Sequence, residues 1–156
     1  MTWSPGEQSI RAMLERRQLQ QVPPNEQHAH QLLEQAQQSL AVAEFASSNG
    51  YLFNAVTEAW EAARKALTAP LTWQGLRPTT EGGHQVVIDA AKAQFGNVLG
   101  GVLRPAARLK RRRNDLEYPT VDAAVESEEV ADLLDAARAI VAAVPHLLRP
   151  ELSVFR

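Results

Sequence analysis

The residues best suited to chemistry lie in the segment Arg108 to Tyr118, where basic side chains are followed by an amide and a phenol. Six of the sixteen basic residues lie between Arg104 and Arg113. Arginine suits phosphate because its planar guanidinium donates paired hydrogen bonds and keeps its charge. Asn114 adds a neutral donor and acceptor, and Tyr118 adds a ring for stacking and a hydroxyl for proton transfer or modification. The segment therefore predicts a site for a phosphate-bearing ligand.

The spacing of this basic run leaves two interpretations open. In a helix, four of its arginines share one face at three- and four-residue steps: Arg104, Arg108, Arg111 and Arg112. Acidic residues gather just beyond, from Asp115 to Asp135, and the net charge of the chain is −2. The run is either a phosphate-binding surface or a solvated face paired with the acidic last helix. Crowded like charges cost free energy that a plain surface need not accept, which favours binding.

The sequence lacks the residues or spacings that several other kinds of site require. The chain has no cysteine, and its four histidines lack a zinc-binding spacing, so we expect no metal and no cofactor. Gly96, Gly100 and Gly101 lack the Lys and Ser/Thr of a phosphate-binding loop. A Ser-His-Asp triad stays open, since its members need not be adjacent, but no local pattern indicates one. We expect His84, which follows two glycines, to cap a helix or pack at its start.

Apolar residues at helical spacing predict an all-α fold, a four- to five-helix up-and-down bundle with no strand. The expected helices span residues 25–48, 51–69, 84–95, 102–118 and 127–148. Asn49-Gly50 should join the first two as an antiparallel hairpin, and Pro70 should end the second. Pro145 should kink the last helix or end it early.

The chain is expected to divide into three parts. Residues 1–24 would form an extension with a short helix and a proline linker, residues 25–149 the bundle, and residues 150–156 a tail. The N-terminal sequence lacks the layout of a signal peptide, and no apolar run approaches the roughly 20 residues that span a bilayer. A cytoplasmic protein without a membrane partner is the expectation.

Three segments resemble the HEPN family. Arg113-Asn114-Asp115-Leu116-Glu117-Tyr118-Pro119 is similar to the HEPN motif, in which an arginine, usually followed by a polar residue, precedes a histidine by four to six positions. The segment from Ala59 to Leu67 resembles the helix that packs beside that motif. Gly75-Leu76-Arg77-Pro78-Thr79 with Gly82-Gly83-His84 is similar to a link found in one bacterial HEPN group. The resemblance covers residues 31–148 and implies the same four- or five-helix bundle.

The resemblance also implies partners and two alternative functions. HEPN domains commonly form homodimers that bring both motifs into one cleft, and their ligands are RNA or nucleotides. Many are metal-independent ribonucleases, including toxins paired with a small nucleotidyltransferase antitoxin. Others are binding modules without catalysis. Two alternative functions therefore stay open. The chain is either a divergent endoribonuclease, or a non-catalytic binding module or partner of a minimal nucleotidyltransferase.

The family's functional residues carry over only in part. The arginine corresponds to Arg113 and the polar residue to Asn114, but Tyr118 stands where the histidine would be. If the motif is taken to begin at Arg111 instead, Leu116 stands where the histidine would be. The expected catalytic residues are Arg113, Asn114 and Tyr118, and the expected phosphate-binding residues are Arg108, Arg111 and Arg112. Tyrosine, with a pKa near 10, is a poor base unless arginines depress that value. Its hydroxyl is alternatively the acceptor of a nucleotidyl group.

Overall fold

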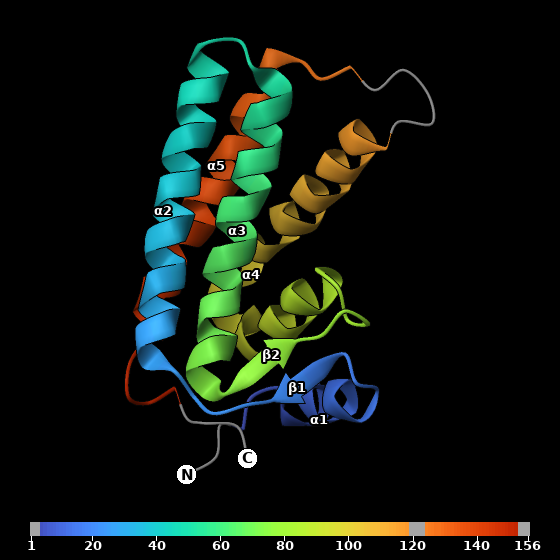
Figure 1. Ribbon diagram of the computed structural model, residues 1–156, viewed down its shortest axis with the longest axis vertical. Helices are drawn as coiled ribbons and strands as arrows, with labels where there is room; N and C mark the ends of the chain where they lie inside the picture. Colours follow the sequence, from blue (N-terminus) through green and yellow to red (C-terminus); the bar gives the residue numbers. More distant parts are fainter. Residues whose placement is uncertain (1–3, 119–123, 153–156) are drawn as a thin grey trace.

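The computed structural model describes residues 4–118 and 124–152. In this part of the chain, helices dominate, which confirms the all-α prediction (Figure 1). The α-helices are α1 (Glu7–Glu15), α2 (Glu26–Ser48), α3 (Leu52–Gln74), α4 (Gln85–Glu117) and α5 (Ser127–Ala143). The remaining elements are the strands β1 (Leu19–Gln21) and β2 (Leu76–Pro78) and the 3-10 turn η1 (Val144–Leu147).

The centre of the bundle is the antiparallel hairpin of α2 and α3, with α5 packed behind it (Figure 1). Asn25 caps α2, its side chain accepting a hydrogen bond of 2.9 Å from the backbone N–H of His28. Alanines at positions 29, 36 and 43 are fully buried, and such small side chains let helix backbones approach closely. The predicted turn at Asn49-Gly50 is confirmed, with Gly50 in the left-handed region at φ 79°.

The prediction that α3 ends at Pro70 is wrong, because the helix continues to Gln74. A proline inside a helix removes one backbone hydrogen bond, at a cost of about 3 kcal/mol. Here the extra turn buries Leu71 and Trp73, which are 1% and 7% exposed, and this burial offsets the cost. The helix ends instead at Gly75, whose φ of 81° suits a left-handed C-cap.

The prediction of separate helices over 84–95 and 102–118 is also wrong. The two are halves of α4, joined by a sharp bend at Gly100, where φ is 34° and ψ is −111°. In Figure 1 the halves run in different directions, the first beside the small strand pair and the second rising obliquely to the upper right. The bend thus sets the direction of the second half of α4, which carries the basic run.

The expectation of no strand is corrected by a small antiparallel pair, in which Leu19 lies opposite Pro78 and Gln21 opposite Leu76. Three-residue strands are too short to show an alternating pattern in the sequence. The pair extends into the following loop, where the Thr79 N–H and hydroxyl both donate to the Gln18 carbonyl, at 3.0 and 3.1 Å. The N-terminal segment therefore holds the loop that leads into α4.

The two ends of the described chain pack onto the bundle. The predicted short N-terminal helix is confirmed as α1, whose Ile10 is fully buried. At the other end α5 stops at Ala143, which confirms the expected effect of Pro145, and the Leu152 carbonyl accepts a 3.1 Å hydrogen bond from Trp73 Nε1. The divisions at residues 24 and 149 stay predictions. Among the described residues, none of the helices combines the length and apolarity needed to cross a membrane.

Candidate phosphate-binding site

The basic side chains between Arg104 and Arg113 lie in three different environments in the structure. Arg104, Arg108 and Arg111 are exposed on the outer side of α4. Arg112, predicted to share that face, is instead directed toward α5. Lys110 and Arg113 are partly buried, and their charges lower the pKa of His84 at the start of the same helix. The expected single face of four arginines therefore reduces to three.

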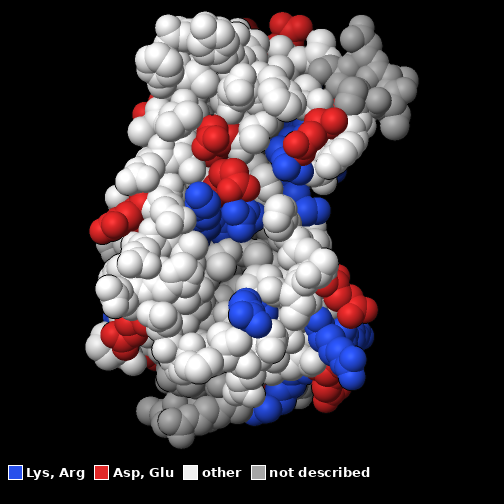
Figure 2. Space-filling view, viewed as in Figure 1, with Lys and Arg blue, Asp and Glu red and all other residues white. Residues whose placement is uncertain are grey.

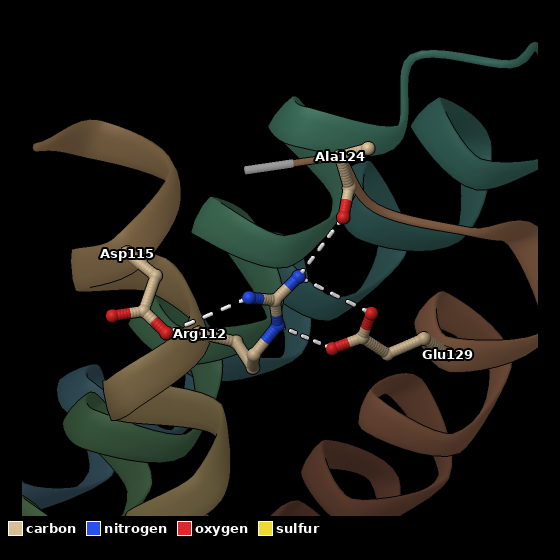
Figure 3. Close-up of polar contacts among 4 residues, drawn as sticks. All are labelled: Arg112, Asp115, Ala124 and Glu129. Atoms are coloured by element: carbon tan, nitrogen blue, oxygen red, sulfur yellow. Dashed lines mark hydrogen bonds and ion pairs between the residues drawn. The ribbon is translucent and has the colours of Figure 1, made fainter. Parts of the chain in front are cut away.

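Arg112 joins α4 to the last helix (Figure 3). Its Nε and Nη2 donate to the Glu129 carboxylate, Nη2 also donates to the Ala124 carbonyl at 3.2 Å, and Nη1 lies 3.5 Å from Asp115. The hydrogen bonds that Arg112 donates to Glu129 raise the pKa of Arg112 above its usual value. The interpretation of the basic run as a face paired with the acidic last helix therefore holds at this residue.

Arg113 has a different environment, although it is the next residue. Its side chain is 23% exposed, and its Nη2 pairs with Glu117 one turn later at 2.6 Å. Its Nη1 donates to the Asn114 side-chain oxygen at 3.3 Å. The Nε is buried and has no hydrogen-bond partner among the residues that the structure describes. Arg113 thus keeps an unused donor and is held only by neighbours on its own helix.

His84 lies at the start of α4 and packs there, as predicted, but its side chain makes no capping hydrogen bond. The imidazole ring is centred 6.0 Å from the ring of Trp60, a buried residue of α3. His84 itself remains exposed. The ring is therefore supported on one side by the core and open to ligands on the other.

The second half of α4 and the middle of α3 both place positive charge near this histidine. Partial burial lowers the pKa of His84, and the charge of Arg64 lowers it further. Glu61 opposes these effects, while Arg113 and Lys110 lower the pKa again. Charges on the second half of α4 thus act on a residue at the start of the same helix. The lowered pKa keeps the ring uncharged at neutral pH.

Arg64 and Glu61, both on α3, form an ion pair. Two hydrogen bonds of 3.1 and 2.8 Å join the Arg64 guanidinium to the Glu61 carboxylate. Burial by itself would raise the pKa of Glu61, but the hydrogen bonds and charge of Arg64, with Lys65 and His84 assisting, hold it below its usual value. The carboxylate is therefore ionised at neutral pH and fixes the guanidinium in place.

Arg64 and His84 line the same open pocket of about 430 Å³. Its wall also includes Thr68 of α3 and the loop residues Thr79 and Thr80. Figure 2 shows Lys and Arg side chains gathered near the middle of this face, over α3 and the second half of α4, with carboxylates beside them. Guanidinium, imidazole and hydroxyl groups are all ligands for phosphate oxygens.

Tyr118 is the C-cap of α4 and is 72% exposed. Its backbone N–H donates to the Asn114 carbonyl at 2.9 Å, and no described residue forms a hydrogen bond to its hydroxyl. The structure thus leaves the phenol accessible. The catalytic role of Tyr118 stays a prediction, as do the roles of Arg113 and Asn114.

Sequence reasoning missed the contribution of Arg64, Glu61 and His84. The segments that contain them had been identified as HEPN-like, but only as packing helix and link. Arg64 and Glu61 pair on α3 and His84 shares a pocket with Arg64, an arrangement that depends on tertiary structure and that no local pattern encodes. Among residues 4–118 and 124–152, no cluster of three or more His, Cys, Asp and Glu side chains has an arrangement that could hold a metal ion.

A helical bundle with an arginine-bearing motif on the last turns of its long fourth helix has the architecture expected of an HEPN domain. The family model described as HEPN domain matches residues 29–147. The chain therefore belongs to the HEPN domain family. Neither a curated protein nor a solved structure matches it.

Proposed function

We propose that this HEPN domain binds RNA through its phosphates, at the surface formed by Arg64, Lys110 and Arg113. The proposal is supported by an open pocket that Arg64 lines together with the exposed His84, and by the charges of Arg64, Lys110 and Arg113, all of which lower the pKa of that histidine. Two of the cations already have carboxylate partners, Glu61 and Glu117. The cluster as a whole still carries excess positive charge, and membership of the HEPN family agrees with a phosphate ligand.

Phosphate binding at Arg113 requires its guanidinium to exchange Glu117 for the ligand. A partly exposed pair between residues four apart in a helix contributes only about 0.3–0.5 kcal/mol. A charge-assisted, bidentate contact with phosphate is stronger than that, so the exchange is favourable. Arg108 and Arg111, exposed on the outer side of the same helix, would add contacts to a longer strand.

The test is fluorescence anisotropy with a labelled single-stranded RNA over a range of salt concentrations. Arg113→Ala should weaken binding by tenfold or more, because one charge-assisted phosphate contact is lost, and should reduce the salt dependence by about one phosphate contact. Arg138→Ala is the control, since it removes an exposed arginine of α5 that pairs with Glu44 of α2, outside the basic run of α4. Equal affinity of wild type and Arg113→Ala would refute the proposed site.

A second candidate function is favoured by the exposure of Tyr118. A phenol that is 72% exposed at a helix end is accessible to a modifying enzyme, as required of an acceptor for a nucleotidyl group. Co-production with a minimal nucleotidyltransferase should then add the mass of a nucleotidyl group to the wild type and not to Tyr118→Phe. An unchanged intact mass in both proteins would exclude this role for the enzyme tested.

A further inference from the structure

We propose that a pocket between α1 and β1 is a second ligand site, which binds a small carboxylate with an apolar body through Arg17. The proposal does not depend on RNA binding. The parts of α1 and β1 that form the pocket precede residue 29, where the match to the HEPN family model begins. The site therefore lies mainly outside the matched domain.

The pocket has a volume of about 400 Å³, which is within the usual range for small-molecule sites. Apolar walls come from Leu14, near the end of α1, and from Leu19 of β1, which is 2% exposed. Arg17 borders the pocket and is exposed, as are Gln20 and Gln21. A charged group thus lies beside an apolar hollow.

Arg17 has a left-handed backbone conformation, with φ at 60°. It follows the C-cap of α1, and its N–H donates to the Leu14 carbonyl at 3.1 Å. The next N–H, that of Gln18, donates to the Met13 carbonyl at 2.9 Å. Together these two bonds form the Schellman motif, in which glycine usually occupies the left-handed position. The Thr79 hydroxyl also donates to the Arg17 carbonyl, which fixes this conformation.

An arginine at this position costs free energy that a glycine would not. Within residues 4–118 and 124–152, Arg17 is the only residue other than glycine with a positive φ. Its guanidinium forms no hydrogen bond or ion pair with any residue that the structure describes. Strained backbone conformations of this kind occur preferentially at ligand sites. The side chain is therefore better explained by a ligand than by a contribution to the fold.

The pocket also indicates the chemical class of the ligand. A guanidinium donates two parallel hydrogen bonds to a carboxylate, and its single charge balances that of the carboxylate. The walls of Leu14 and Leu19 favour an apolar group next to the charge. The hydroxyl hydrogen of Thr79, which also lines the pocket, is already bonded to backbone carbonyls. It adds no donor for a dianion such as phosphate.

The first test is an NMR titration of the full chain with 4-methylpentanoate, whose apolar part resembles a leucine side chain. The amide signals of Arg17, Leu19 and Thr79 should shift and saturate. The uncharged analogue 4-methylpentanamide should bind at least tenfold more weakly, because it loses the charge-assisted contact. Inorganic phosphate should not displace the carboxylate.

The same titration distinguishes two sources of the carboxylate. An acetylated dipeptide ending in leucine presents a carboxylate beside the same apolar group. Tighter binding of the dipeptide would assign the site to the C-terminus of a protein, and tighter binding of 4-methylpentanoate would assign it to a free acid. Both results support the proposed site.

A second test uses Arg17→Asn to separate ligand binding from folding. Asparagine tolerates the left-handed conformation, so the midpoint of thermal unfolding should equal or exceed that of wild type. The affinity for 4-methylpentanoate should fall at least tenfold. Arg16→Asn is the matched control, because Arg16 is exposed and adjacent but does not line the pocket. It should keep the wild-type affinity.

Three results would overturn the proposal. The first is the absence of saturable shifts in wild type at millimolar 4-methylpentanoate. The second is equal affinity for the acid and the amide, or equal affinity of wild type and Arg17→Asn, since either would exclude the guanidinium from recognition. The third is a lower unfolding midpoint in Arg17→Asn, which would give this side chain a structural role. RNA binding at Arg113 is measured separately and is independent of all three.

Discussion

At the residue scale, two adjacent arginines have different environments, and we expect a structural role for Arg112 and a ligand-binding role for Arg113. Arg112 is held by Glu129 and Ala124 across a helix interface, whereas Arg113 is held only within its own helix. The Arg112 and Glu129 side chains are 21% and 22% exposed. An arginine with three protein acceptors gains little from a phosphate. We therefore expect stability to depend on Arg112 and ligand affinity on Arg113.

The corresponding prediction concerns Glu129→Gln. Removing this carboxylate should lower the free energy of unfolding by about 1–3 kcal/mol, because a partly buried guanidinium loses its charged partner. Glu44→Gln is the matched change at the Arg138–Glu44 pair, where both side chains are more than 40% exposed, and it should cost less than about 1 kcal/mol. Urea denaturation measures both. Equal effects of the two substitutions would contradict the structural role of Arg112.

At the scale of the element, α4 determines whether the site exists. The bend at Gly100 sets the direction of the second half of the helix, which carries Lys110 and Arg113, and the charges of these two residues lower the pKa of His84. A straight helix of that length would carry the basic run away from the pocket, since each residue adds about 1.5 Å of rise. The conformation of one glycine therefore controls the geometry of the proposed RNA-binding surface.

Two glycine substitutions in α4 should act in opposite directions. Gly100→Ala should destabilise the protein by about 1 kcal/mol or more, because alanine is strained at a φ of 34°. Gly96→Ala, in the helical part with no atom within 4 Å of the added Cβ, should stabilise it by about 0.5–1 kcal/mol. Thermal unfolding measures both. A stabilising effect of Gly100→Ala would mean that the bend is not required by the folded state.

The sequence predicted the elements whose signal is local. The hairpin of α2 and α3 follows from apolar spacing and Asn49-Gly50, and the end of α5 follows from Pro145. The continuation past Pro70 was missed because burial of Leu71 and Trp73 outweighs the local penalty. The pocket shared by Arg64 and His84 was missed because it depends on tertiary structure. The motif alone predicts Arg113 as a site residue, and its role in ligand binding is a prediction.

At the scale of the whole molecule, we predict a homodimer. HEPN motifs commonly work in pairs, and α4, the helix that carries Arg113, has Val98 73% exposed. Light scattering at micromolar concentration should give twice the monomer mass. Val98→Lys should weaken the dimer, because it places a charge in an apolar contact. Phe45→Lys, at an exposed apolar residue of α2, is the control. A strict monomer would contradict the paired-motif arrangement.

The pairing of β1 with β2 also has a consequence for amide hydrogen exchange. The N–H groups of Val22 and Thr79 bond between the N-terminal segment and the 75–79 region, to Gly75 and Gln18, at 2.8 and 3.0 Å. Local opening releases such bonds together as one cooperative unit. The amide hydrogens of the loop before His84 should therefore exchange together with those of the N-terminal segment. The free energy of this local opening should be below that of opening the helical bundle. Transient opening of that segment would release His84 while the bundle around Arg113 stays folded.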